Sequence, residues 1–295
     1  MSSLQVAKPR ASFREWLSNP WAETRFLWVV AIGYVVWTMV PVAEAVLFSF
    51  NKGRSITQWE GFSLRWYLWD PDGSVLHNAQ LQHAIWHTLT LAALTALFAV
   101  PPAVAFALAL HHWRGRTSGT QNFLMMFSFV TPELILAVAL FLLMTSVFTS
   151  LGLSTTSQVI GLTVLALAYP VVIVRARLLS LGRSVEEAAM DLGASPLGTL
   201  WRVTLPLLWP SIFASAAIIF AFALDDFVIV NQLSQDAATQ TVSITIYGAA
   251  RTSPTPAMNA IGTLMLTAST ILIVIAWVVY RRSARRRGDA PMAAA

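Results

Sequence analysis

The stretch Ser184–Pro206, SVEEAAMDLGASPLGTLWRVTLP, separates two long apolar runs of a 295-residue chain. It carries four charged side chains, Glu186, Glu187, Asp191 and Arg202. Charged groups are costly in hydrocarbon, so this stretch is too polar to cross a bilayer. It therefore predicts a loop between two membrane-spanning helices, and the remaining apolar runs can be placed around it.

Local signals divide this stretch into two short helices. Ser184 precedes Glu186 and Glu187 in the pattern of an N-terminal cap, with acids at the positive end of a helix. Gly193 stands where a first helix can stop, because glycine accepts a left-handed conformation. Pro196 suits the first turn of a second helix. We therefore expect a helix, a turn and a second helix.

The composition indicates a polytopic, all-α membrane protein that lies in a lipid bilayer. Hydrophobic residues make up 56% of the chain and charged residues only 11%, whereas soluble domains carry about 25% charged residues. The chain has no cysteine, which excludes disulfides and thiolate metal sites. The net charge of +5 does not indicate nucleic-acid binding, because the basic residues lie beside the apolar runs.

Apolar runs of about 20 residues predict six spans. A polar segment, 1–25, precedes them without the pattern of a removable signal peptide. An outer connection, 51–83, separates the first span from a core that covers 84–280, and a basic tail covers 281–295. Five of the expected spans contain proline. The six spans are residues 26–50, 84–110, 123–148, 159–179, 207–230 and 261–280.

The distribution of positive charge predicts the orientation. With the N-terminus inside, the inner segments hold 15 of the 19 Lys and Arg residues. The outer segments then hold only Lys52, Arg54, Arg65 and Arg251. The positive-inside rule thus places both termini in the cytoplasm. The polar stretch 184–206 between the fourth and fifth spans is then cytoplasmic as well.

The spacing within this stretch resembles the EAA loop of ATP-binding-cassette importer permeases. The motif runs Glu187-Ala188-Ala189, three residues, Gly193, nine residues, an aliphatic residue, one residue and then Leu205-Pro206. Val203 stands in the aliphatic slot, which is usually held by Ile. The resemblance implies a cytoplasmic helix–turn–helix that docks on an ATPase subunit. It assigns coupling to the ATPase to these eight residues: Glu186, Glu187, Ala188, Ala189, Asp191, Gly193, Leu205 and Pro206.

Residues 80–282 are similar to the MetI-like permease superfamily, and within it to the second permease subunit of spermidine/putrescine importers. Phe48-Ser49-Phe50-Asn51, Trp59 to Ser63 and Trp66-Tyr67 resemble its first outer loop. Thr131-Pro132-Glu133 and Leu224-Asp225-Asp226-Phe227-Val228 resemble its third and fifth spans. The resemblance implies a type I importer fold in the cell (inner or plasma) membrane. It also implies three partners: an ATPase dimer, a second permease that forms a heterodimer with this chain, and an extracytoplasmic substrate-binding protein.

Three acids inside the expected spans are candidates for a substrate pathway: Glu133, Asp225 and Asp226. A carboxylate within a bilayer is a functional hypothesis by default. Asp225 and Asp226 are adjacent and point about 100° apart on a helix, so they cannot both face one groove. The alternative is that this pair marks the water boundary or holds helices together. No metal site is expected, because His83 and His87 lack a third ligand.

The chain is expected to be a non-catalytic subunit. It has no G-x-x-x-x-G-K-[ST] phosphate loop, so ATP and Mg²⁺ would be bound by a partner ATPase and no cofactor by this chain. The expected cargo is a polyamine, and the alternative within this class is another small organic solute. An ion-coupled secondary transporter is a rival, in which Glu133 and Asp225 act as relays. An intramembrane enzyme is a weaker rival, because no catalytic constellation is evident.

Overall fold

The computed structural model describes residues 24–71, 73–112 and 130–286. The segment 1–23, the basic loop with Arg114 and Arg116, the start of the expected third span and the end of the tail lie outside the described residues. Within the described residues the regular structure is helical, apart from one antiparallel bridge between Asn51 and Phe62. This confirms the expected all-α class.

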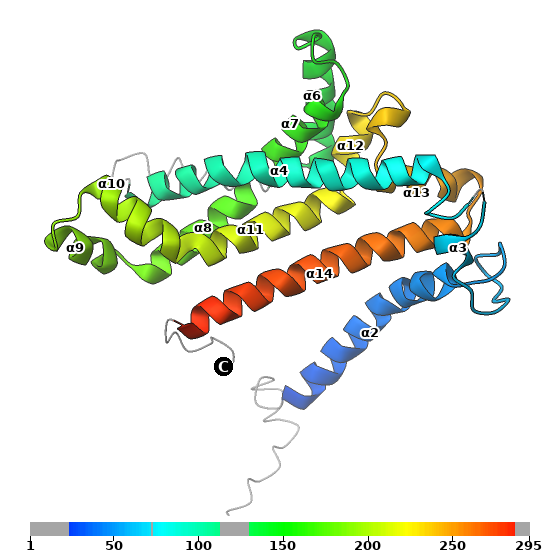
Figure 1. The fold of residues 1–295 in the computed structure, drawn as a ribbon, viewed down its shortest axis with the longest axis horizontal. Coiled ribbons are helices and arrows are strands. Elements are labelled where there is room, and N and C mark those ends of the chain that lie inside the picture. The colour runs from blue at the N-terminus through cyan, green and yellow to red at the C-terminus, as the bar shows by residue number, and fades with distance from the viewer. Residues whose placement is uncertain (1–23, 72, 113–129, 287–295) are drawn as a thin grey trace, which may run out of the picture.

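Three long helices lie side by side across the molecule (Figure 1). They are α4 (Ala79–His112), α11 (Leu205–Asp225) and α14 (Pro256–Arg286). The helix α11 packs against both α4 and α14, and also against α8 (Ala168–Leu181). The first helix, α2 (Thr24–Ser49), packs against α14 and leaves most of its surface open.

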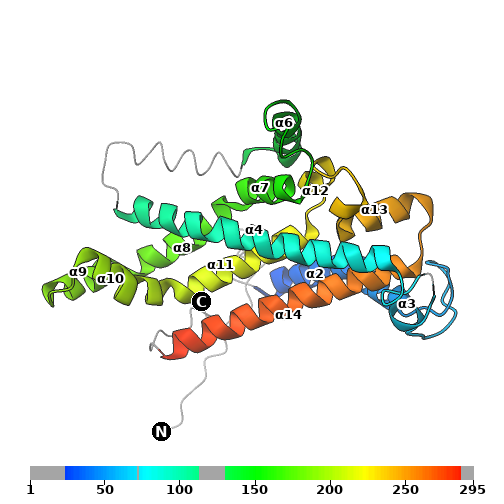
Figure 2. The ribbon, with the colours of Figure 1, turned by 45° about the horizontal axis from the view of Figure 1, so that its top comes forward.

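The two ends of this layer carry short elements. At one end, called here the loop end, lie α9 (Ser184–Asp191), α10 (Pro196–Thr199) and the π-helical turn Leu200–Thr204 (Figure 1). At the opposite end lie α3 (Arg65–Leu68) and α13 (Val242–Thr252). A third group projects to one side of α4 in both ribbon views (Figure 2). This side group consists of α6 (Glu133–Ser146), α7 (Thr155–Ala166) and α12 (Val228–Gln232), followed by the 3₁₀ turn Ala237–Thr239.

Four helices in the described residues are long and apolar enough to cross a membrane. They cover 27–49, 79–112, 196–225 and 256–282. A fifth span results if α7 and α8 count as one, although they meet at a 40° bend. The part of the expected third span that the structure describes contains α6, which with 14 residues is shorter than the about 20 that a span needs. Residues 123–129 of that span lie outside the described residues.

Prolines explain two of these departures. Pro132 was expected inside a span, but it is the N-cap of α6 with an extended ψ of 127°, since proline lacks the N–H that a helix interior needs. Pro170 lies in the first turn of α8, and the proline ring clashes with the carbonyl group four residues earlier. That residue is Ala166, the last of α7, so the fourth span is broken where it was expected to be continuous.

Other helix ends also differ from the expected ones. The second span begins five residues earlier than expected, at Ala79, and the sixth begins at Pro256. The fifth ends at Asp225 instead of residue 230, because Asp226 has an extended ψ of 127° and a new helix, α12, follows. The expected polar connection 231–259 contains α13.

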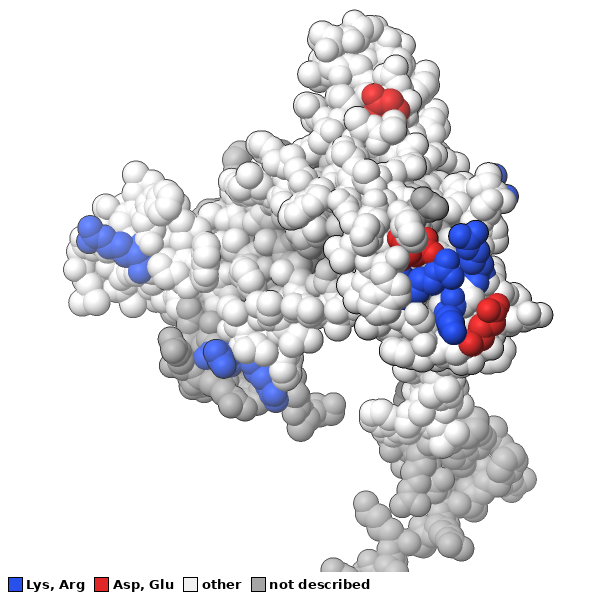
Figure 3. Space-filling model, turned by 45° about the vertical axis from the view of Figure 1, so that its right-hand side comes forward, with Lys and Arg blue, Asp and Glu red and all other residues white. Residues whose placement is uncertain are grey.

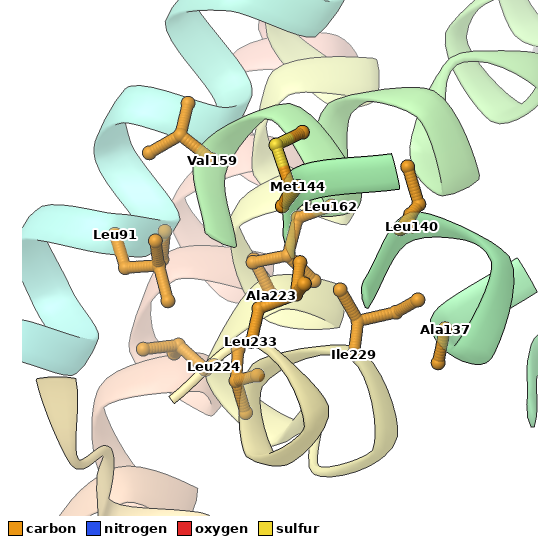
Figure 4. Close-up of a cluster of buried hydrophobic side chains, with 12 residues drawn as sticks. Leu91, Ala137, Leu140, Met144, Val159, Leu162, Ala223, Leu224, Ile229 and Leu233 are labelled. Carbon is orange, nitrogen blue, oxygen red and sulfur yellow. The ribbon is translucent and has the colours of Figure 1, made fainter. Parts of the chain in front are cut away.

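A buried cluster joins the side group to the long helices (Figure 4). Leu91 of α4 and Leu224 of α11 meet Met144 of α6 and Leu162 of α7 in it. Gly161 permits the close approach of α7 and α12, because a Cβ there would lie 2.8 Å from the side chain of Ile229. The side group is therefore packed as part of the core.

Charged side chains cover little of the face that Figure 3 shows. In Figure 3 they form a few patches, the largest on the end built by α3 and α13, and most of the visible surface is white. Large apolar side chains are exposed along α2, and Trp37 keeps 79% of its surface open. Uncharged sides with charged ends are typical of a chain that spans a bilayer.

Candidate functional site

The EAA loop, residues 184–206, forms two short helices joined by a glycine turn. Gly193 has φ +87° and stands just after α9, and its N–H donates to the carbonyl of Met190 at 2.9 Å. A left-handed residue at this position ends a helix by satisfying its last carbonyls. The predicted stop at Gly193 is confirmed.

The expected cap at Ser184 is wrong. The helix α9 already includes Ser184, its N-cap is Arg183, and no side chain caps it. Gly182, with φ +70°, ends α8 only two residues before α9 begins. The helix α9 therefore begins at Ser184, one residue earlier than a cap at Ser184 would allow. A cap forms instead on the second helix, where the Ser195 Oγ accepts from the N–H of Gly198 at 3.1 Å. Pro196 occupies the first turn, as predicted.

Glu186 ties α9 to two other elements, α4 and the π-helical turn. Its Oε2 lies 2.9 Å from Nε2 of His112, the last residue of α4, and its Oε1 accepts from the Thr204 hydroxyl at 2.9 Å. Arg183 adds a third tie by donating to the carbonyl of His111 at 2.7 Å. The sequence analysis predicted none of these contacts of His112, Thr204 and Arg183. The contact of His112 could not be read from local spacing, because His112 is 74 residues away from Glu186 in the chain.

The same contacts decide the charge state of Glu186. Burial favours the protonated form, but the hydrogen bonds from His112 and Thr204 outweigh it and lower the pKa of Glu186 below its ordinary value. A carboxylate that accepts hydrogen bonds is stabilised in its charged form. Glu186 is therefore an anion at neutral pH and can serve as a permanent anchor for the loop.

The free surface of the loop is largely apolar. Leu192 is 91% exposed at the turn, and Leu197 and Trp201 are exposed beside it. Glu187 and Asp191 are exposed on α9. A cavity of about 460 Å³ lies between this loop and the end of α4. Its lining includes the Thr199 hydroxyl, which has no hydrogen-bond partner among the described residues. Exposed apolar side chains rimmed by charge are typical of a protein-docking surface.

The remaining residues that were predicted to couple to an ATPase lie along the same segment. Ala188 is exposed and Ala189 is half-buried in α9. Leu205 and Pro206 form the first turn of α11, directly after the π-helical turn. The loop is thus continuous with a long helix, and a displacement of the loop acts directly on α11.

Two of the three acids predicted to line a substrate pathway come together at the junction of α6, α11 and α12. Asp226 is buried, and its carboxyl lies within hydrogen-bonding reach of Glu133, the first residue of α6. Oδ1 of Asp226 accepts from the N–H groups of Ile229 and Val230 at 3.1 and 3.2 Å, which starts α12. Asp225 is exposed. The two adjacent aspartates therefore differ in burial.

A buried amide that sequence reasoning missed holds the surrounding segments in place. Gln158 of α7 contacts Nε2 of His87 at 2.9 Å and donates to the carbonyls of Val230 and Thr239. It therefore links α4, α7, α12 and the following 3₁₀ turn. His87 was considered above as a metal ligand, and in the structure its ring contacts Gln158. The described residues contain no group of three metal-binding side chains.

The comparisons with known proteins identify the family. Residues 99–288 match the family described as "Binding-protein-dependent transport system inner membrane component", and the chain belongs to it. It is a permease subunit of an ATP-binding-cassette importer and a multi-pass membrane protein. Subunits of this kind are non-catalytic, and ATP hydrolysis belongs to a partner ATPase.

Two named relatives extend over nearly the whole chain. The putrescine transport system permease protein PotI of Escherichia coli (strain K12) is 31% identical and covers 91% of this chain and 94% of its own length. The spermidine/putrescine transport system permease protein PotC of Haemophilus influenzae is 29% identical and covers 88% of this chain and 99% of its own length.

Solved structures agree on the fold. A bacterial transporter for the acidic polysaccharide alginate has a chain with TM-score 0.68 and 17% identity, covering 90% of this chain and 98% of that one. The methionine transporter MetNI, in inward-facing conformations, has a TM-score of 0.60 and 19% identity, covering 69% and 95%. The predicted importer-permease fold is confirmed.

Proposed function

We propose that this permease imports polyamines such as putrescine and spermidine. The observation that carries the proposal is the contact between the Glu133 and Asp226 carboxyl groups in a largely uncharged helical chain. Two adjacent carboxylates repel each other, so at least one must be protonated or face a cation. An ammonium group supplies both the positive charge and N–H donors.

The relatives support the same cargo. The chain is 31% identical to a permease named for putrescine and 29% identical to one named for spermidine and putrescine. In this proposal Glu133 and Asp226 bind an ammonium group on its way through the protein. Asp225, which is exposed, attracts the cation to this point. A linear polyamine passes from one such site to the next.

We further propose six spans, with the third completed by residues before Val130 and with α7 and α8 as one broken span. Both termini then face the cytoplasm. Of the 19 Lys and Arg residues, only Lys52, Arg54, Arg65 and Arg251 fall outside. This orientation follows the positive-inside rule. It places the EAA loop in the cytoplasm and α3 and α13 on the outer side.

The EAA loop is the proposed coupling element. Its exposed Leu192, Leu197 and Trp201 dock on a dimeric ATPase, which binds ATP and Mg²⁺, and Glu186 passes the movement to α4. Docking shifts the transporter between two states because the ATPase contacts differ between them.

Two further partners complete the proposed importer. A second permease subunit forms the pathway together with this chain, and a substrate-binding protein docks on the outer side. The related alginate transporter supports the second of these partners, because its structure is also solved in complex with a periplasmic protein bound to an alginate pentasaccharide.

ATPase stimulation of the reconstituted complex tests the cargo. The complex is supplied with binding proteins loaded with putrescine, spermidine, spermine or a neutral ligand. We expect the polyamine-loaded proteins to stimulate hydrolysis, with matching uptake of labelled amine into vesicles. Stimulation and uptake only with a non-cationic ligand would reject the polyamine assignment and leave the importer class intact.

Two alternatives have specific support. The alginate transporter shows that this fold is found with a ligand other than an amine, so another organic solute is the first alternative. A carboxyl pair can also carry a proton, which would suit an ion-coupled transporter. Deleting the ATPase separates the second alternative from the proposal, since import in its absence would require an ion gradient.

A further inference from the structure

One face of α13 covers the junction that contains Asp226. Ser243, Tyr247 and Arg251 are spaced by four residues and therefore lie along one stripe of the helix. The Ser243 hydroxyl donates to the backbone carbonyl of Asp226 at 2.8 Å. The ring of Tyr247 lies 4.5 Å from the ring of Phe227, centroid to centroid. The stripe therefore begins beside Asp226 and continues along α13 to Arg251.

The last residue of the stripe already places a cation on the aromatic face. The guanidinium carbon of Arg251 lies 4.5 Å from the ring centroid of Tyr247. Within the described ranges, the side-chain ion pairs are Arg65–Asp70 and His112–Glu186. Among the described residues, the charge of Arg251 is therefore met by the Tyr247 ring and by no carboxylate.

We propose that Tyr247 and Phe227 form a cation-accepting wall beside the acid pair, and that Arg251 occupies this wall until an alkylammonium group of the substrate replaces it. The inference rests on the proposed polyamine function and adds its selectivity element. The wall receives an amine from the outer side and passes it to Asp226 and Glu133.

The chemistry of the wall fits a polyamine better than a metal ion or a neutral solute. An aromatic face attracts an ammonium group that lies within about 6 Å of the ring centroid. The methylene segments between the amines can lie against Phe227, which is half-buried. Tyr247 is 44% exposed, so its face is open to a ligand once the guanidinium moves away. A neutral solute could not displace the guanidinium.

The test uses the reconstituted complex of both permeases and the ATPase, with saturating putrescine-loaded binding protein. The measured quantity is the number of putrescine molecules moved per ATP hydrolysed. The apparent affinity for putrescine is not used, because it is set by the binding protein. We expect Tyr247→Leu to lower this ratio about 5-fold, within the range of a partly desolvated cation–π contact. Tyr247→Phe keeps the ring, so its ratio stays within about 2-fold of wild type on the same basis. Tyr34→Leu, on exposed α2, is the matched control.

Arg251 separates a binding role from a structural one. Because the guanidinium competes with the amine for the wall, Arg251→Gln should raise the ratio above that of wild type, and an unchanged ratio would remove Arg251 from the wall. If stacking of Arg251 on Tyr247 merely stabilises α13, Arg251→Gln and Tyr247→Leu lower the ratio together, which overturns the inference.

The outcomes also separate the inference from the function on which it rests. A wild-type complex that moves no amine would reject the polyamine function itself. A wild-type complex that moves putrescine, with Tyr247→Leu equally efficient, would reject the wall and leave the function standing.

Discussion

Glu133 and Asp226 show how two acids become one site. Asp226 is held by the N–H groups of Ile229 and Val230, so its position is fixed by the first turn of α12. Glu133 approaches from the start of α6, which Pro132 sets. The two side chains are 93 positions apart in the chain, and only the packing of the side group on α11 brings them together.

Glu133→Gln should lower amine import at least about 10-fold, since it removes one charge that meets the ammonium group and a charged hydrogen bond is worth roughly 1.5–3 kcal/mol. The measurement is uptake of labelled putrescine in cells that contain normal amounts of the complex. Glu44→Gln, in α2, is the control. Unchanged uptake by Glu133→Gln would remove Glu133 from the pathway.

Glu186 makes a prediction about pH. Its pKa is lowered, so its stabilising contribution is fully present above the ordinary value of 4.5 and is lost as the pH falls through the lower folded value. The purified complex with Glu186→Gln should therefore melt below wild type at pH 7. The difference should persist down to about pH 5 and shrink in more acidic buffer.

The control for this experiment is Glu187→Gln, because Glu187 is exposed on the same helix. It should melt within about 1 °C of wild type at every pH, as exposed substitutions usually do. A melting difference for Glu186→Gln that grows in acid would contradict the assigned sign.

At the scale of elements, the EAA loop is a lever whose angle is set by Gly193. Proline at this position would force φ to about −65° and remove the N–H that bonds Met190. Gly193→Pro should therefore uncouple ATP hydrolysis from import, or lose ATPase co-purification, while membrane insertion continues. Glu187→Lys, which reverses an exposed charge on α9, should have the same effect.

Insertion is checked by the amount of permease in the membrane fraction, and coupling by amine moved per ATP. The control is Gly33→Ala in the exposed helix α2. A proline control at Gly248 is not suitable, because it would break α13. Normal transport by either loop variant would show that this loop is not the coupling element.

The contact between α7 and α12 gives a second prediction at this scale. Gly161→Val would press against Ile229 and Leu233, whose side chains lie 2.8 Å from the position of a Cβ. Overpacking of this kind costs about 1–3 kcal/mol, so the complex should melt at a lower temperature. Gly248→Ala is the control, because its Cβ would meet nothing within 4 Å. Equal melting of Gly161→Val and wild type would show that α7 and α12 can separate freely.

For the whole molecule, the absence of cysteine makes the proposed orientation directly measurable. Thr57→Cys and Ser184→Cys each place one exposed thiol at opposite ends of the long helices. A membrane-impermeant maleimide should label Thr57→Cys in intact cells and Ser184→Cys only after permeabilisation. The reverse pattern would invert the orientation and place the EAA loop outside.

The sequence by itself determined the class of molecule and the place of its loop. Low charge and long apolar runs require a bilayer, because such surface cannot be left in water. The spacing from Glu187 to Pro206 identified the loop, since Gly193 and Pro196 act through their own backbone geometry. Local chemistry of this kind is readable without knowledge of distant neighbours.

Only the tertiary structure decided which residues became partners. The anchoring of Glu186 by His112, the pairing of Asp226 with Glu133 and the hub at Gln158 join residues far apart in the chain. Such contacts arise from the packing of whole helices. The spacing of side chains along one segment does not indicate which other helix will lie beside it.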